Sequence, residues 1–318
     1  MNTTCTRPHT VVTGASSGIG RVTALRLAAA GHHVFAGVRK PADAPHYAKG
    51  SQTACPRPVG GSRGLVPPRP APGDITPLLL DVTDAGQIGA AARAVADHTA
   101  GSGLNGLVNN AGIGVFGPLE IIPIEQFRRQ LEVNVTGQLA VTQAFAPLLR
   151  RARGRIVLIG SIGTRFTPPF TGPVSASKAA IATMADALRQ ELAPWDIRVV
   201  LIEPASVHTE AVDKLERDAA RLISESGPGA RGLYEDSFSR MVRVGLARER
   251  RGSPPDVVAQ AVAHALAARR PHARYLVGKD SRPMAIMAAA LPAPVLDGLR
   301  RKVTRQPARG ALAGHAAS

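Results

Sequence analysis

The chain has 318 residues, of which 44% are hydrophobic, 19% are charged and 3% are aromatic. The apolar fraction supports a sizeable core and excludes a chain that is disordered throughout. The net charge of +16 raises nucleic acid as a partner, but residues 240–318 hold 15 Lys and Arg against 4 Asp and Glu, scattered among Ala, Gly and Pro. Because aromatic stacking platforms are also few, we interpret this segment as solvated and expect no nucleic-acid binding.

The cellular compartment follows from what the chain lacks. No apolar run reaches the ~18 residues that a membrane span needs. The first residues have neither the basic nor the apolar part of a secretory signal. Cys5 and Cys55 are too few for a disulfide framework or for a four-ligand metal site. We therefore expect a cytoplasmic protein without a metal.

Short apolar runs alternate with longer helical patterns. In chain order, strands are predicted at 10–13, 33–38, 77–81, 105–109, 155–161, 197–203 and 274–277. Helices are predicted between them at 18–30, 85–100, 125–151, 174–192 and 255–269. This alternation predicts one α/β domain over residues 1–304, with a Rossmann-type doubly wound parallel sheet of about seven strands. Two segments do not fit: 41–73, an irregular insertion rich in Pro and Gly, and 305–318, a flexible tail.

A glycine-rich turn joins the first strand to the first helix. It reads Thr13-Gly14-Ala15-Ser16-Ser17-Gly18-Ile19-Gly20. Glycines allow a backbone to approach a pyrophosphate closely, and the helix N-terminus offers unpaired N–H groups and a partial positive charge. The position of this turn, between a strand and a helix, predicts a dinucleotide site.

From about residue 10 to residue 277, apart from the insertion, the sequence resembles the short-chain dehydrogenases/reductases. The pattern TGxxxGxG of the turn carries the resemblance, together with Asn109-Asn110-Ala111-Gly112 after the fourth strand. The resemblance implies that Asp81, with Val82, holds the adenine amino group, and that Pro204-Ala205 with Thr209 holds the nicotinamide amide. Ala205 replaces the usual glycine, which adds strain if the backbone there has a positive φ. The implied cofactor-binding residues are Thr13, Gly14, Ser16, Ser17, Gly18, Ile19, Gly20, Arg39, Asp81, Val82, Asn109, Ala111, Gly112, Lys178, Pro204, Val207 and Thr209.

The end of the second strand predicts which cofactor binds. An NAD site usually has an acid there, which accepts hydrogen bonds from the ribose. Here the strand ends Gly37-Val38-Arg39-Lys40. A guanidinium can pair with a 2′-phosphate, so the sequence favours NADP over NAD. The alternative is that both cations are ordinary surface residues.

The resemblance also implies a catalytic group of Asn, Ser, Tyr and Lys. Asn134, Ser161 and Lys178 match three of its members, and Val174 occupies the Tyr position. Valine has no exchangeable proton, and losing a general acid lowers a rate by about 10²- to 10⁴-fold. Ser161 and Lys178 could still polarise a carbonyl while water supplies the proton. Of the other tyrosines, only Tyr234, in the expected lid, is a remote substitute.

The substrate side predicts an apolar alcohol or carbonyl compound, as in the steroid- and retinol-type members of the family. Residues 205–250 are expected to form a lid. Apolar residues in the lid and in the loops expected near it are Phe116, Phe166, Phe170, Leu215, Leu222, Ile223, Leu233, Phe238 and Met241, although several could be ordinary core. The resemblance further implies a homodimer or homotetramer. Two functions remain open: an NADP-dependent oxidoreductase that Val174 impairs, and a non-catalytic NADP(H)-binding protein with a structural or regulatory role.

Overall fold

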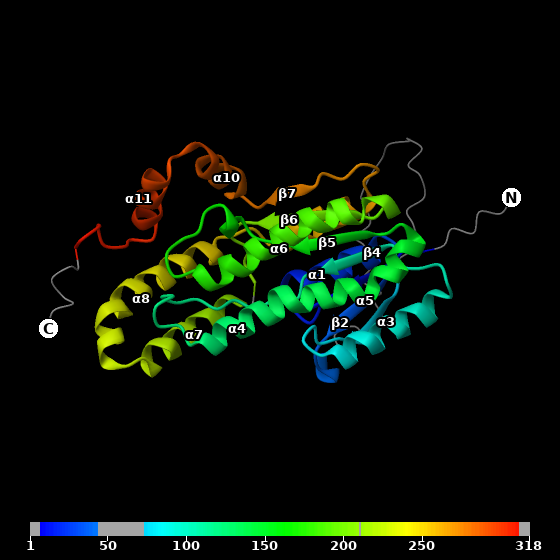
Figure 1. Cartoon of the computed structure of the whole chain (residues 1–318), viewed down its shortest axis with the longest axis horizontal. Helices are drawn as coiled ribbons and strands as arrows, with labels where there is room; N and C mark the ends of the chain where they lie inside the picture. The colour runs from blue at the N-terminus through cyan, green and yellow to red at the C-terminus, as the bar shows by residue number, and fades with distance from the viewer. Residues whose placement is uncertain (1–6, 44–72, 210, 312–318) are drawn as a thin grey trace, which may run out of the picture.

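A seven-stranded parallel sheet forms the centre of the molecule (Figure 1). The structure is a computed structural model that describes residues 7–43, 73–209 and 211–311. The strand order is β3-β2-β1-β4-β5-β6-β7. Successive strands are added on one side of β1 up to β3 and on its other side from β4 onward, and doubly wound folds bind ligands at such a switch point between β1 and β4. This arrangement confirms the predicted Rossmann-type fold. The strands are β1 (His9–Val12), β2 (His33–Val38), β3 (Ile75–Leu79), β4 (Gly106–Asn109), β5 (Arg155–Ile159), β6 (Arg198–Pro204) and β7 (Arg274–Val277).

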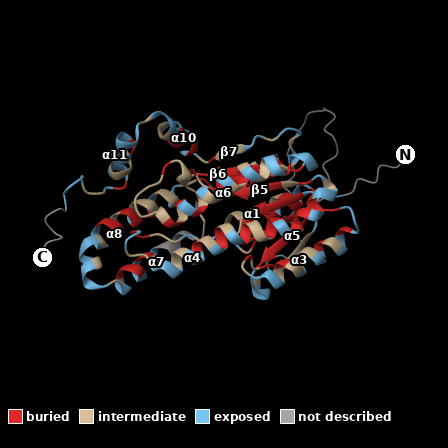
Figure 2. Cartoon of the chain, in the orientation of Figure 1, coloured by how far each residue is buried: buried red, intermediate tan, exposed pale blue. Residues whose placement is uncertain are grey.

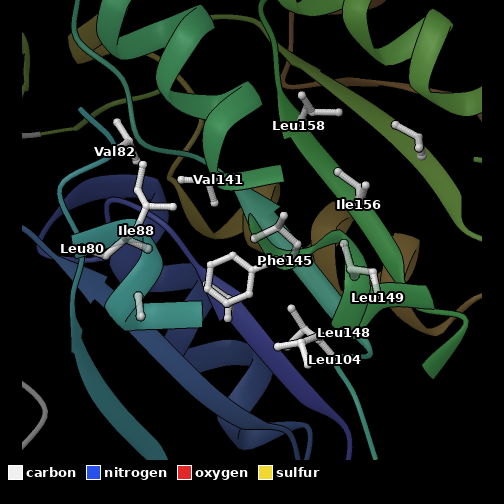
Figure 3. Close-up of a cluster of buried hydrophobic side chains, with 14 of the residues drawn as sticks. Leu80, Val82, Ile88, Leu104, Val141, Phe145, Leu148, Leu149, Ile156 and Leu158 are labelled. Atoms are coloured by element: carbon white, nitrogen blue, oxygen red, sulfur yellow. The ribbon is translucent and has the colours of Figure 1, made fainter. Parts of the chain in front are cut away.

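Helices cover both faces of the sheet. On one face lie α3 (Ala85–Thr99), α5 (Gly137–Ala152) and α6 (Gly172–Glu191), and on the other lie α1 (Gly18–Ala29) and α9 (Asp256–Ala267). Figure 2 shows burial concentrated in the strands and in the inward sides of these helices. Phe145 of α5 is fully buried at the centre of the larger apolar cluster, between α3 and the sheet (Figure 3). The apolar stripes predicted from the sequence are therefore the faces that pack on the sheet.

The predicted helix 125–151 is not one regular helix. It consists of α4 (Ile124–Leu131), a π-helical turn (Glu132–Thr136) and α5, without a gap between them. A π turn contains one residue more than an α turn, and such turns are frequent at functional sites. Asn134 lies in this turn and is fully buried. The other predicted elements agree with the structure to within a few residues.

Four helices go beyond the sequence predictions. α7 (Ala211–Glu225) and α8 (Pro228–Arg250) pack against each other in the region expected to be a lid. α10 (Ser281–Ala290) and α11 (Ala293–Val303) follow the last strand and lie at the upper left of the molecule (Figure 1).

The start of the expected insertion, Pro41–Asp43, forms a 3₁₀ turn, and residues 44–72 lie outside the described part. Of the expected tail, residues 305–311 are described and contain neither helix nor strand.

Candidate active site

The glycine-rich turn has a shape that only glycine fits at two of its positions. Gly14 has a φ of +63°, and a Cβ atom there would lie 2.8 Å from the Cα atom of Ala111. A Cβ atom on Gly20 would lie 2.2 Å from the carbonyl oxygen of Gly14. The helix that follows begins after Ser17, whose side chain makes no capping hydrogen bond, and its first turn contains no acid. The N–H groups of α1 therefore face an electropositive opening suited to a phosphate.

A cleft of about 260 Å³ lies at this turn, at the carboxyl ends of β1 to β4. Eleven of the residues predicted to bind cofactor line it: Gly14, Ser16, Ser17, Gly18, Ile19, Arg39, Asp81, Val82, Ala111, Gly112 and Thr209. The structure adds five that the sequence prediction omitted: Leu80, Asn110, Ile113, Arg129 and Val133. Six predicted residues lie outside its wall: Thr13, Gly20, Asn109, Lys178, Pro204 and Val207.

Thr13 and Asn109 hold the walls of the cleft together from behind. Thr13 is buried, and its Oγ1 atom accepts hydrogen bonds of 3.0 Å from the backbone N–H groups of Asn110 and Ala111. The Asn109 carboxamide points into the core, where its Nδ2 atom donates to Thr142. Asn110 is the residue that faces the cleft, and its Nδ2 atom donates to the carbonyl oxygens of Thr13 and Gly14. Thr13 and Asn109 thus support the cleft without lining it.

Charged side chains gather at the end of the cleft next to β2 and β3. Arg39 follows β2, and its side chain is exposed. Asp81 follows β3, and its Oδ1 atom accepts hydrogen bonds from the backbone and the hydroxyl of Thr83. Burial alone would raise the pKa of the Asp81 carboxyl, but these hydrogen bonds and the charges of Arg129 and Arg39 lower the pKa below its usual value. Asp81 is therefore a carboxylate at neutral pH, able to accept a hydrogen bond from an amino group.

A row of amide side chains on the helix facing the cleft holds the loop 111–115. Gln130, Asn134 and Gln138 are spaced four residues apart, so they project in a row, with a rise of about 6 Å between them. An extended chain rises about 6.6 Å over two residues, so alternate residues of the loop match this spacing. The bonds are Val115 N–H to Gln130 (2.6 Å), Gln130 to Ile113 O (2.7 Å), Ile113 N–H to Asn134 (2.8 Å), Asn134 to Ile113 O (3.0 Å) and Gln138 to Ala111 O (3.0 Å).

The predicted catalytic residues lie at the ends of β5 and α6. Ser161 follows β5, and its Oγ atom accepts a 3.0 Å hydrogen bond from the N–H of Gly163, which leaves its own proton available. Lys178 donates from Nζ to the carbonyl oxygen of Ile159 at 2.7 Å, and burial lowers the pKa of its ammonium to about 8. The carboxamide of Asn134 is bonded to Ile113 and to the hydroxyl of Ser177, so its contact to α6 runs through Ser177.

No described tyrosine replaces the phenol missing at Val174. Val174 lies in the first turn of α6, one turn before Lys178, and its side chain carries no polar atom. Tyr234 donates its proton to Glu120, and this hydrogen bond raises the pKa of the phenol. The hydroxyl of Tyr275 accepts a hydrogen bond from the backbone N–H of His272. Both residues lie near the amino end of β7, whereas the cleft lies at the carboxyl ends of the strands. The third tyrosine, Tyr47, lies outside the described residues.

The loop after β6 is fixed to α8. The backbone N–H of Val207 donates to Oε2 of Glu249 at 3.0 Å. Burial raises the pKa of the Glu249 carboxyl, although the hydrogen bonds from Val207 and Ser206 oppose the rise. Ala205 is not among the described residues with a positive φ, so alanine fits there without the strain considered from the sequence. A Cβ atom on Gly18 would lie 3.6 Å from Thr209, which brings this loop against the glycine-rich turn.

Most of the apolar residues expected around the substrate pack against other parts of the chain. Phe238 and Met241 of α8 join Leu222 and Ile223 of α7 in a small core of their own. Phe116 and Phe170 lie against this core, half-buried. Phe166 packs instead with α10 and α11, Leu233 is exposed, and the side chain of Leu215 lies outside the described part. Phe116 and Phe170 are therefore the aromatic groups of that set that remain partly accessible.

The fold and the cleft together define a dinucleotide-binding α/β protein. The family model described as short chain dehydrogenase matches residues 69–220. The NADPH-dependent 3-dehydrocapnine reductase of Ornithobacterium rhinotracheale is 31% identical over 91% of this chain and 94% of its own length. Human retinol dehydrogenase 5 is 32% identical over 94% of this chain and 89% of its own length. This chain belongs to the short-chain dehydrogenase/reductase family.

A solved structure of the family agrees in both fold and coverage. It is a short chain dehydrogenase from Burkholderia cenocepacia J2315 in complex with NADP, which is 26% identical to this chain. It superimposes with a TM-score of 0.65 and covers 92% of this chain and 97% of that one. In the described part of the present chain, no helix is both long enough and apolar enough to cross a membrane.

Proposed function

We propose that this chain is an NADP-dependent oxidoreductase that acts on an apolar alcohol or carbonyl compound, and that Val174 lowers its rate. The observation that carries the cofactor assignment is Arg39 at the cleft end of β2, where no acid is present to accept from a ribose hydroxyl. The glycine positions of the turn, which a Cβ atom would fill, fit a dinucleotide phosphate. Relatives that are named as an NADPH-dependent reductase and a retinol dehydrogenase support the reaction class and the apolar substrate.

A bound reduced nicotinamide supplies a hydride to the carbonyl carbon. The hydroxyl of Ser161 has its proton available, so it can donate a hydrogen bond to the carbonyl oxygen. Lys178, at pKa about 8, carries a positive charge at neutral pH that favours negative charge on that oxygen. The side chain of Val174 cannot deliver the proton that the oxygen must gain, so we assign this proton to water. In this reading α7 and α8 are the lid that covers the substrate.

The alternative is a non-catalytic NADP(H)-binding protein with a structural or regulatory role. The valine at 174 favours it, because binding needs the cleft but not a proton donor. The retained Asn134, Ser161 and Lys178 favour the enzyme, because a protein without catalysis would have no reason to keep all three together.

One titration tests the cofactor assignment, and one assay separates the two functions. Fluorescence titration should show that NADPH binds at least about tenfold more tightly than NADH, because the 2′-phosphate adds a charge-assisted hydrogen bond. Equal dissociation constants would refute the role of Arg39. NADPH oxidation with a panel of apolar ketones and aldehydes should show slow turnover. Tight NADPH binding without turnover of any of these compounds would favour the non-catalytic alternative.

A further inference from the structure

A second guanidinium shares the charged end of the cleft with Arg39. Arg129 belongs to α4, on the side of the cleft formed by the helices, whereas Arg39 extends from the sheet. Both side chains line the same cleft. The charges of both also lower the pKa of the Asp81 carboxyl, which lines the same cleft. Positive charge therefore reaches the end of the cleft from two separate elements.

Apart from its effect on the Asp81 carboxylate, the charge of Arg129 makes little contact with the protein itself. Its side chain is exposed, and among the described residues its hydrogen bond is a weak one of 3.4 Å from Nη1 to the hydroxyl of Thr83. The neighbouring Arg128 is different, because it forms an ion pair with Glu125 on the same helix. An exposed arginine contributes little to fold stability through such a contact. Arg129 is thus free to move toward an anion in the cleft.

The two dinucleotides differ at one position, the 2′-phosphate, which carries up to two negative charges. One guanidinium neutralises a dianion only in part, and two that approach from different sides neutralise it and fix its position. We propose that Arg129 is a second residue that selects the phosphorylated cofactor, pairing with the 2′-phosphate from α4 while Arg39 pairs with it from β2. This inference rests on the proposed NADP dependence. It adds a residue on α4 to the usual selectivity position at the end of β2.

The test compares Arg129→Gln with Arg128→Gln as its matched control, since both remove one exposed cation from the same helix. The dissociation constants of NADPH, NADH, 2′,5′-ADP and 5′-AMP are measured for both variants, for Arg39→Gln and for the unchanged chain. Arg129→Gln should weaken NADPH and 2′,5′-ADP by about tenfold and leave NADH and 5′-AMP within about twofold. Arg128→Gln should change none of the four by more than about twofold. Arg129→Lys should restore part of the affinity, and high salt should reduce the difference.

The outcomes separate this inference from the proposal beneath it. If Arg39→Gln removes the preference for NADPH and Arg129→Gln does not, the inference fails and the proposed function stands. If Arg129→Gln weakens all four ligands equally, Arg129 supports the adenine or the turn around Thr83, and the selectivity role is wrong. If the unchanged chain binds NADH as tightly as NADPH, the proposed cofactor and the inference both fail. Thermal melting of each variant shows whether a loss reflects unfolding, and Arg129→Lys carries the test if Arg129→Gln does not fold.

Discussion

Restoring a phenol at Val174 is the most informative change to this site. Val174 and Lys178 are one helical turn apart on α6, and Ser161 follows β5, the strand that precedes the helix. In the proposed site, Ser161 and Lys178 would assist a tyrosine at position 174. We predict that Val174→Tyr creates or greatly raises carbonyl reductase activity with NADPH.

The size of the gain follows from the charge on Lys178. Residues four apart on a helix have Cβ atoms about 5–6 Å from each other. A phenolate oxygen about 5.5 Å from the Nζ atom of Lys178 would be attracted to the ammonium by about 3 kcal/mol at an effective dielectric constant of about 20. This attraction lowers the pKa of the introduced phenol by about 2 units from about 10. Because the pKa of Lys178 is about 8, most of the ammonium is charged at pH 7. A phenol tuned in this way should raise turnover by at least about 10²-fold.

The assay is NADPH oxidation with several apolar ketones and aldehydes, before and after the change. Val174→Phe is the matched control, because it introduces the same ring without the hydroxyl. Activity should rise only with tyrosine, and the turnover of that variant should depend on pH through the phenol. If the unchanged chain already turns over rapidly and tyrosine adds nothing, or if phenylalanine gives the same gain, position 174 does not hold the proton donor.

Three further predictions concern stability and assembly. Lys178→Met should raise the free energy of unfolding at pH 7 by on the order of 2 kcal/mol. The folded pKa of Lys178, about 8, lies below the ordinary 10.5, so the stability of the unchanged chain rises with pH between these two values. The stability advantage of the Met variant should therefore vanish above pH 10.5. Urea unfolding that shows the same difference between the two chains at pH 7 and at pH 11 would contradict this. Glu249→Gln should stabilise the fold at pH 7 but not at pH 3.5. The pKa of the Glu249 carboxyl is higher in the folded than in the unfolded chain, so the stability of the unchanged chain falls as the pH rises through that range. Thermal melting of both chains at the two pH values checks this. Light scattering should find a dimer or tetramer, and monomer alone at micromolar concentration would be against it.

The fold was predictable where short segments determine their own conformation. The glycines of the first turn and the apolar strands could be recognised from short sequence patterns, and the sheet confirms the predicted α/β order. The π turn around Asn134 was not predictable, because its extra residue leaves the apolar pattern of a long helix almost unchanged. α10 was missed because its Ala-rich sequence follows the last strand and has no clear polar face. Neither omission could be recovered from the apolar periodicity of the sequence alone.

The same limit applies to the candidate site. Motif position placed Asn109 in the cofactor site, but only the structure shows that its carboxamide points into the core and that Asn110 faces the cleft. Arg129 belongs to no motif and lies on an exposed face, so motif matching does not find it. The available signal was its place five residues before Asn134, which becomes meaningful only when the path of α4 past the cleft is known.

The row of amides on α4 and α5 has a consequence for the motions of the site. Loop 111–115 is held by side chains of a helix, where a strand of the sheet would be held by backbone hydrogen bonds. The amide protons of Ile113 and Val115 are therefore shielded from exchange with solvent by Asn134 and Gln130 rather than by a neighbouring strand. Rotation of two side chains releases them without separating β4 from β1 or β5. We therefore expect hydrogen exchange at these two amides to require only this local opening, while the sheet beneath stays intact.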